Sequence, residues 1–208
     1  MYDPKIILDF HQKIALKYPY VKKESWLKLE EISIVQILKR NEVLCREGEK
    51  LNHGIFIVEG QLKLYYINES GIERISTFCT DNEYMDNWSD VHQQSPLPYS
   101  ISALTDTILI KYPLRDMVRI FKKEPDLLQL CIDLSQEIIQ KKQEHYRILT
   151  LKSPMERYGH LMENQKGWIQ TFSLTELAKY LHMSRETLSR ARTACLTEKN
   201  NLDRGPMS

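Results

Sequence analysis

The chain has 208 residues, of which 42% are hydrophobic and 27% are charged, and its formal net charge is +1. This length allows one large or two small domains with real cores. The near-neutral net charge excludes a polycation. The sequence shows no apolar run that is long enough to span a bilayer and no pattern typical of a signal peptide. These observations predict a cytoplasmic protein with no membrane partner.

Two helices are predicted first, over residues 3–18 and 24–31, from apolar residues at helical spacing. From about Ile32 the pattern changes to short apolar runs that are separated by turn signals. Strands of this length and spacing are typical of an antiparallel sandwich or barrel. The predicted strands cover residues 35–39, 42–46, 54–59, 61–67, 72–78, 100–105 and 107–111.

After Pro113 the apolar period becomes helical, and Pro125 separates a short helix from a long one. Within residues 126–150, seven positions recur at alternating four- and three-residue steps, which is the heptad pattern of a coiled coil. We therefore predict a parallel two-stranded coiled coil and a homodimer. The alternative is a helix that packs its apolar stripe against its own barrel. The seven positions are Leu127, Cys131, Leu134, Ile138, Lys141, His145 and Ile148.

Residues 172–190 read as two short helices around a tight turn. Ser173 and Glu176 have the spacing of a capping box, and leucines at helical spacing follow them. Residues 182–183 can make the turn, although the glycine often found in such turns is absent. Ser184 can cap the second helix, and Leu188 would face inward. This pattern predicts a helix-turn-helix.

Arg185, Glu186, Ser189 and Arg190 would then face outward from the start of the second helix, the part that enters the major groove in such motifs. An arginine can pair with guanine through two hydrogen bonds, and a glutamate can accept one from a cytosine amino group. Ser173, Ser184 and Thr187 are better placed to anchor phosphates. The alternative is an ordinary helical hairpin with solvated charges. Residues 150–208 carry nine basic and six acidic side chains, which agrees weakly with a DNA-binding role.

The cysteine and histidine spacings point to no metal or redox site. No two of the four cysteines are close in sequence, so a C-x-x-C motif is absent. The six histidines show no ligand spacing. We expect reduced, mostly buried cysteines, no metal, no cofactor and no enzymatic activity.

A barrel, a long helix and a helix-turn-helix in this order resemble the cyclic-AMP receptor protein/FNR (Crp/Fnr) family of bacterial transcription regulators. Residues 184–190 match that family's recognition helix closely, and Glu156-Arg-Tyr158 is similar to a segment of Bacteroidetes-type members. The turns at 47–49, 57–60 and 71–73 also look like the family's sensor barrel.

The resemblance implies an α+β fold in which an antiparallel jelly-roll barrel of the cyclic-nucleotide-binding type leads into a long dimerisation helix. A C-terminal helix-turn-helix of winged-helix type would follow. The expected domains are residues 1–112 with the N-terminal helices, a linker and dimerisation helix over 113–150, and a DNA-binding domain over 151–208. Family precedent supports base contacts from Arg185, Glu186 and Arg190.

Three departures from the family pattern matter. Tyr99 stands where cyclic-nucleotide binders carry the arginine that holds the phosphate, their Gly-Glu pair is absent, and Glu83, Asp86 and Asp90 would repel an anion. Cyclic AMP is therefore not expected to bind. An FNR-type iron–sulfur cluster is excluded because there is no N-terminal group of cysteines. Residues 197–208 have no strand pattern, so we expect the wing to be missing and this tail to be mobile.

The long irregular segment 80–99 is typical of a functional loop. We predict that it contributes to a pocket for an unidentified small-molecule effector. The alternative reading is that its aromatic side chains fill a degenerate barrel. The candidate pocket residues are Tyr84, Asp86, Trp88, Tyr99 and Ser100.

The sequence as a whole predicts a dimeric, sequence-specific regulator of transcription with double-stranded DNA as its partner. RNA polymerase and a small-molecule effector are further partners that this interpretation allows. The alternative is a small-molecule signalling module whose helix-turn-helix makes protein contacts.

Overall fold

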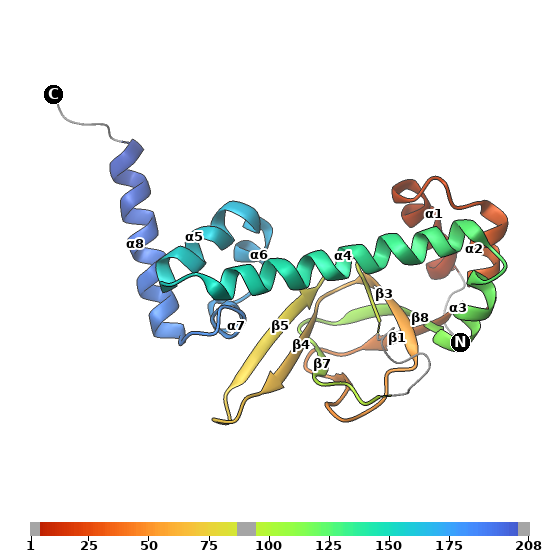
Figure 1. The fold of residues 1–208 in the computed structure, drawn as a ribbon, viewed down its shortest axis with the longest axis horizontal. Helices are drawn as coiled ribbons and strands as arrows, with labels where there is room; N and C mark the ends of the chain where they lie inside the picture. The colour runs from red at the N-terminus through yellow and green to blue at the C-terminus, as the bar shows by residue number, and fades with distance from the viewer. Residues whose placement is uncertain (1–4, 87–94, 204–208) are drawn as a thin grey trace. The chain divides into compact units, whose positions relative to one another are not determined.

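The computed structural model describes residues 5–86 and 95–203 (Figure 1). These residues pack as two compact units. The first unit joins Met1–Tyr66 with Phe78–Gln140, and the second joins Ile67–Thr77 with Lys141–Ser208. Among the described residues, no helix combines the length and the apolar character that a membrane crossing would need.

Two four-stranded sheets form the barrel, with strand orders β1-β8-β3-β6 and β2-β7-β4-β5 (Figure 1). The pairings β1–β8, β2–β7, β3–β6, β3–β8 and β4–β7 are antiparallel, so the predicted antiparallel barrel is confirmed. The strands are β1 (Ile34–Leu38), β2 (Val43–Cys45), β3 (His53–Glu59), β4 (Leu62–Ile67), β5 (Glu73–Cys79), β6 (Tyr84–Met85), β7 (Ser100–Ala103) and β8 (Thr107–Pro113).

Alternation along β3 and β8 creates two separate cores, because successive side chains of a strand point to opposite faces. Ile55, Ile57 and Leu109 belong to the cluster inside the barrel, and all three are fully buried. Phe56 and Ile110 lie on the other face, in a cluster shared with the helices of the first unit. This second core explains why the sheet carries apolar residues on both faces.

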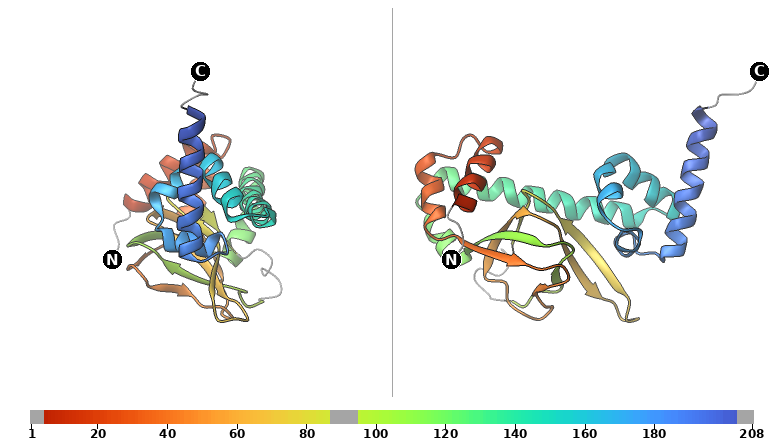
Figure 2. Two further views of the ribbon diagram at one scale, coloured as in Figure 1. Left: turned by 90° about the vertical axis from the view of Figure 1, so that its left-hand side faces the viewer. Right: turned by 180° about the vertical axis from the view of Figure 1, so that it is seen from behind.

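Three short helices cover the outer face of that sheet: α1 (Lys5–Lys17), α2 (Lys23–Glu30) and α3 (Leu114–Phe121). The first two agree with the helices predicted over 3–18 and 24–31. Phe10, Ile14 and Trp26 supply their buried contacts. The right view of Figure 2 shows α1 and α2 beside the N-terminal part of α4 (Pro125–Thr150). Tyr18 donates a 2.9 Å hydrogen bond to Glu137, near the middle of α4.

The predicted coiled-coil seam of α4 is wrong, because its residues are used inside their own chain. Leu127 and Leu134 are buried in the core of the first unit, and His145 and Ile148 are buried in the second unit. The alternative reading, a helix packed on its own barrel, describes Leu127 and Leu134 but not His145 and Ile148. A different apolar stripe stays exposed: Leu128 is 49%, Ile132 44%, Ile139 51% and Tyr146 73% accessible.

The second unit is helical apart from the hairpin end 67–77, with α5 (Pro154–Asn164), α6 (Lys166–Thr171), α7 (Leu174–Tyr180) and α8 (Arg185–Asp203). The helix α8 continues to Asp203. Residues 197–203, which we expected to be part of a mobile tail, are therefore helical. Residues 204–208 of that tail lie outside the described residues. From Leu114 to Asp203 the described residues contain no strand, which agrees with a missing wing.

A candidate nucleic-acid interface

The helix α7 begins as its sequence predicts. The hydroxyl of Ser173 accepts a 3.2 Å hydrogen bond from the backbone N–H of Glu176, which satisfies one of the free donors of the first turn. Leu177, Ala178 and Tyr180 turn inward and are buried. Lys179 lies on the outer side, where its ammonium group is 3.1 Å from Glu73 and 3.5 Å from Glu176.

A left-handed residue makes the turn between α7 and α8. His182 has φ of +55°, a conformation that ordinarily favours glycine, and this replaces the glycine that the sequence lacks. Its ring packs edge-on against His145, with the centroids 5.6 Å apart. Burial, followed by the nearby His145, Arg74 and Arg157, lowers the pKa of His182 to about 4. The turn therefore carries no histidine charge at neutral pH.

The start of α8 is fixed by a cap and by two buried side chains. The hydroxyl of Ser184 accepts a 3.1 Å hydrogen bond from the backbone N–H of Thr187. Leu188 is fully buried and Ala191 nearly so, and α8 packs against both α5 and α7. These contacts fix which face of the helix is left to solvent.

The four residues predicted to face outward from the start of α8 lie together on that exposed face. Arg185, Glu186, Ser189 and Arg190 are all exposed, and their spacing of one, four and five residues places them on one side of the first two helical turns. Thr187 is half-buried, with its hydroxyl 3.0 Å from that of Ser184. The structure thus brings all of the predicted α8 contacts to one helix end.

Two positively charged side chains, Arg185 and Arg190, and one negatively charged side chain, Glu186, are exposed to a ligand on this face. Hydrogen bonding to its own backbone N–H, then to Ser184, lowers the pKa of the Glu186 carboxyl, with smaller effects from Arg185 and Arg190. Glu186 is therefore an acceptor at neutral pH. The guanidinium of Arg190 makes a 3.5 Å contact with the hydroxyl of Thr187, which orients it along the helix surface.

Sequence reasoning missed the residue that ties the helix-turn-helix together. Arg157 on α5 donates to the backbone carbonyls of Leu149, Leu151 and Leu181 over 3.0–3.1 Å. These carbonyls lie at the end of α4 and at the end of α7, where free acceptors are expected. No spacing rule points to such a role. A signal did exist for the capping box of Ser153 and Glu156 that starts α5, because it has the S-x-x-E pattern.

Two aromatic residues of the predicted effector pocket, Tyr84 and Tyr99, pack against different hydrophobic clusters. Tyr84 is buried in the core shared with the helices, with its ring 4.9 Å from that of Phe56. Tyr99 packs against the cluster inside the barrel, and burial raises its pKa to about 12. Ser100 accepts a 3.0 Å hydrogen bond from the backbone N–H of Glu47. Asp86 is half-buried, and Trp88 lies outside the described residues.

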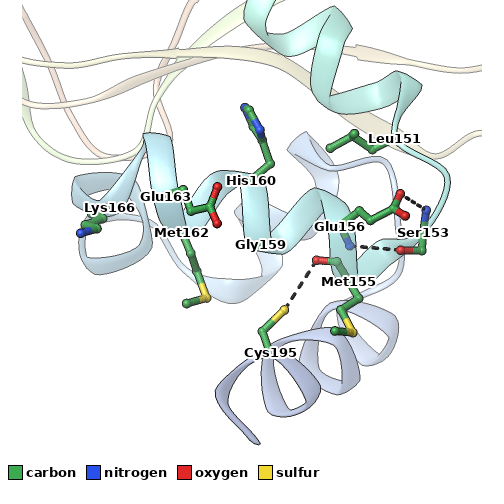
Figure 3. A pocket seen from close by; sticks show the side chains of 10 residues that line it. All are labelled: Leu151, Ser153, Met155, Glu156, Gly159, His160, Met162, Glu163, Lys166 and Cys195. Carbon is green, nitrogen blue, oxygen red and sulfur yellow. Dashed lines mark hydrogen bonds between the residues drawn. The ribbon is translucent and has the colours of Figure 1, made fainter. Parts of the chain in front are cut away.

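A cavity of about 880 Å³ lies on the second unit, and none of the predicted contact residues is among those that line it (Figure 3). Met155, Met162 and Cys195 give it a sulfur-rich wall, and the Cys195 thiol donates to the carbonyl of Met155 over 3.5 Å. All four cysteines are free thiols. Among the described residues, no three histidine, cysteine, aspartate or glutamate side chains gather into a metal site.

The chain is similar to known proteins in sequence. Residues 35–124 match the family model described as "Cyclic nucleotide-binding domain". The "Anaerobic regulatory protein" of Haemophilus influenzae is 27% identical over 164 residues, which are 74% of this chain and 63% of that protein. The "Transcriptional activator protein anr" of Pseudomonas aeruginosa is 26% identical over 167 residues, 75% of this chain and 68% of that one. The match thus covers less than two thirds of the first of these relatives.

Solved structures show the same fold at lower identity. A protein from Eubacterium rectale that is assigned to the Crp/Fnr family superposes with a TM-score of 0.67 at 16% identity. That match covers 87% of this chain and 86% of the other.

Proposed function

We propose that this chain is a Crp/Fnr-type regulator, a dimeric protein that binds specific DNA sequences and regulates transcription. The observation that carries the proposal is the capped start of α8, with Arg185, Glu186, Ser189 and Arg190 exposed on one face. A helix-turn-helix presents this part of its second helix to the major groove.

Each side chain has a distinct role in this proposal. Arg185 and Arg190 would each pair with the O6 and N7 atoms of a guanine, and Glu186 would accept from a cytosine amino group. Ser189 can bond to either kind of base edge. Ser173, Ser184 and Thr187 would contact phosphates, and the positive end of each helix N-terminus favours those anions. No catalytic group is part of the proposal.

The exposed stripe of α4 is the dimer interface that we propose in place of the predicted seam. Each residue of the proposed interface follows a residue of the predicted seam by one position. A shift of one residue rotates the interface by about 100° around the helix axis. Isoleucine at two successive a positions and leucine at two of the four d positions favour a pair of parallel helices. The a positions are Ile132, Ile139 and Tyr146, and the d positions are Leu128, Ser135, Lys142 and Leu149.

Salt dependence of duplex binding separates this function from the alternative, in which the helix-turn-helix contacts protein. Phosphate contacts release counterions, so log K should fall linearly with log salt, with a slope of about −0.9 for each phosphate contacted. We expect a steep negative slope when fluorescence anisotropy is measured on labelled duplexes at 50–300 mM salt, roughly the range over which such slopes are read. A helix-turn-helix that serves only protein contacts would show no salt-sensitive affinity for DNA.

We also propose that the barrel does not bind cyclic AMP. Its interior is filled by apolar side chains such as Leu38, Ile57 and Leu62, each of which is completely buried. Tyr99 packs against this cluster at the position where a guanidinium would hold the cyclic phosphate. Ser100, next to it, is already bonded to the Glu47 backbone.

Cyclic AMP should therefore leave the thermal stability unchanged. A ligand at 100 times its Kd stabilises the folded state by about 2.7 kcal/mol, which would raise Tm by roughly 5–10 °C in a chain of this size. We expect a shift of less than about 1 °C at millimolar cyclic AMP in a calorimetric scan. A concentration-dependent rise in Tm would show that the barrel does hold the nucleotide.

A further inference from the structure

The last turn of α4 and the end of α7 meet at one junction in the second unit, to which residues 141–208 belong. The helix α4 ends at Thr150, and α5 begins at Pro154 after the short linker 151–153. A helix leaves the carbonyl groups of its last turn without partners of its own. The carbonyl groups of two helix ends therefore need donors from other segments at this junction.

Arg157 on α5 supplies three of these donors from one side chain. Its Nε donates to the carbonyl of Leu151 over 3.1 Å, one Nη donates to that of Leu181 over 3.1 Å, and the other donates to that of Leu149 over 3.0 Å. The guanidinium group is planar, and its N–H groups point in fixed directions. Hydrogen bonds from an ionised donor are also roughly twice as strong as those between neutral groups. Arg157 therefore holds the end of α4, the linker and the end of α7 in one fixed arrangement.

His145 on α4 adds a second connection to the end of α7. The residue is 7% exposed, and its Nε2 lies 2.8 Å from the carbonyl oxygen of Tyr180. A carbonyl oxygen only accepts, so Nε2–H is the donor. The His145 ring also stacks on the Tyr180 ring, with the centroids 4.1 Å apart and an angle of 17° between the planes. Two successive carbonyl groups at the end of α7, those of Tyr180 and Leu181, are thus bonded to α4 and α5 respectively.

We propose that Arg157, assisted by His145, is a positioning residue that sets the spacing of the two DNA half-sites. The proposal rests on the proposed function, because it concerns the angle between α8 and the proposed dimer interface. Tyr146 of that interface directly follows His145 and is 73% exposed, so one turn of α4 carries both a dimer contact and the connection to α7. A helix-turn-helix that cannot turn against the interface places the two copies of α8 in a symmetric dimer at one separation. Arg157 itself lies on α5 and contacts no base in this proposal.

Duplexes that differ only in half-site spacing test this role. Each carries the same two half-sites, taken from the duplex that the parent protein prefers, with their separation changed by one or two base pairs. A further duplex carries a single half-site. One added base pair rotates a half-site by about 34–36° around the DNA axis. To follow this rotation, the helix-turn-helix must turn against α4 and break at least one hydrogen bond to the Arg157 guanidinium. Such a bond to a charged group corresponds to about tenfold or more in an equilibrium constant.

We expect the parent protein to prefer one spacing over the neighbouring ones by at least about tenfold in anisotropy titrations of the full chain. Arg157→Gln should reduce this preference at least about threefold, because it removes the three-way connection. Its affinity for the single half-site should stay within about twofold of the parent protein's, because the contacts of α8 are unchanged. A residue needed only for folding would instead lower the affinity for every duplex alike.

Two further variants complete the test. Arg157→Lys keeps the charge, but its single ammonium group cannot span three carbonyl groups, so it should also weaken the spacing preference. This variant decides the question if Arg157→Gln fails to fold. Arg115→Gln, at an exposed position on α3, should leave the preference unchanged. An unaltered spacing preference in the Arg157 variants, equal affinity of the parent protein at every spacing, or loss of single-half-site affinity in both variants overturns the proposal. A parent protein that binds no duplex would contradict the proposed function itself.

Discussion

Alanine at both Arg185 and Arg190 should weaken binding to a preferred duplex roughly 30-fold to 10⁴-fold per half-site. Each two-bond arginine–guanine pair discriminates by about 1–3 kcal/mol, and a tenfold change in affinity corresponds to about 1.4 kcal/mol. Both side chains are exposed, and Leu188 and Ala191 hold the helix in place from the opposite face, so the fold should survive the change. Anisotropy titrations at fixed salt measure the loss.

A control with the same change in charge separates base reading from general electrostatics. Arg115 and Arg119 lie exposed on α3 of the first unit, and alanine at both positions also removes two positive charges. This variant should bind the preferred duplex within about twofold of the parent protein, since neither arginine belongs to the helix-turn-helix. If the α8 variant lost no more affinity than the α3 variant, the assignment of Arg185 and Arg190 would be wrong.

Aspartate at Ile132 and Ile139 should convert the proposed dimer to a monomer. Full burial of one isoleucine contributes about 1.5–3 kcal/mol. Because these residues are about half-exposed in the single chain, four of them across the interface contribute about 3–6 kcal/mol. The double substitution removes this contribution and places four negative charges, two from each chain, in the proposed interface. Both residues are about half-exposed in the single chain, so the monomer should stay folded. Sedimentation would then show a species of 24.6 kDa, the mass of one chain.

Two further variants test which stripe forms the interface. Gln140→Asp places the same charge on an exposed position just beside the stripe and should remain dimeric. Leu127→Asp lies in the seam that the sequence predicted, but that residue is buried in the core of the first unit. It should lower Tm rather than dissociate a folded dimer. A fully dimeric Ile132→Asp/Ile139→Asp protein would contradict the proposed interface.

The error in the seam has a simple physical origin. Apolar residues stand side by side along α4, as in Leu127-Leu128 and Ile138-Ile139, so two stripes share the same heptad period. Periodicity identifies both stripes but does not say which one the barrel covers. That choice depends on packing between segments far apart in sequence, such as Phe10 and Trp26 against Leu134.

Local signals explain why the helix-turn-helix and every described strand except β6 (Tyr84–Met85) were predicted correctly. Alternation along Gly54–Val58 and the cap at Ser184 act within a few residues, so the sequence contains them fully. The prediction of an effector pocket depended on the directions of the Tyr84 and Tyr99 side chains, which the sequence does not give. In the structure the two side chains pack in different cores. The role of Arg157 arises only when two helix ends meet at its guanidinium group.

Selection of preferred sites from a random duplex library tests the central claim most directly, because it requires both the α8 contacts and the paired chains. The account predicts an inverted repeat that contains guanines, with half-sites about one helical turn, or 10–10.5 base pairs, apart. Conversion of Arg185 and Arg190 to alanine should erase the motif from a parallel selection. Recovery of no enriched sequence, or of a single half-site without its symmetric partner, would contradict a dimer that reads DNA through α8.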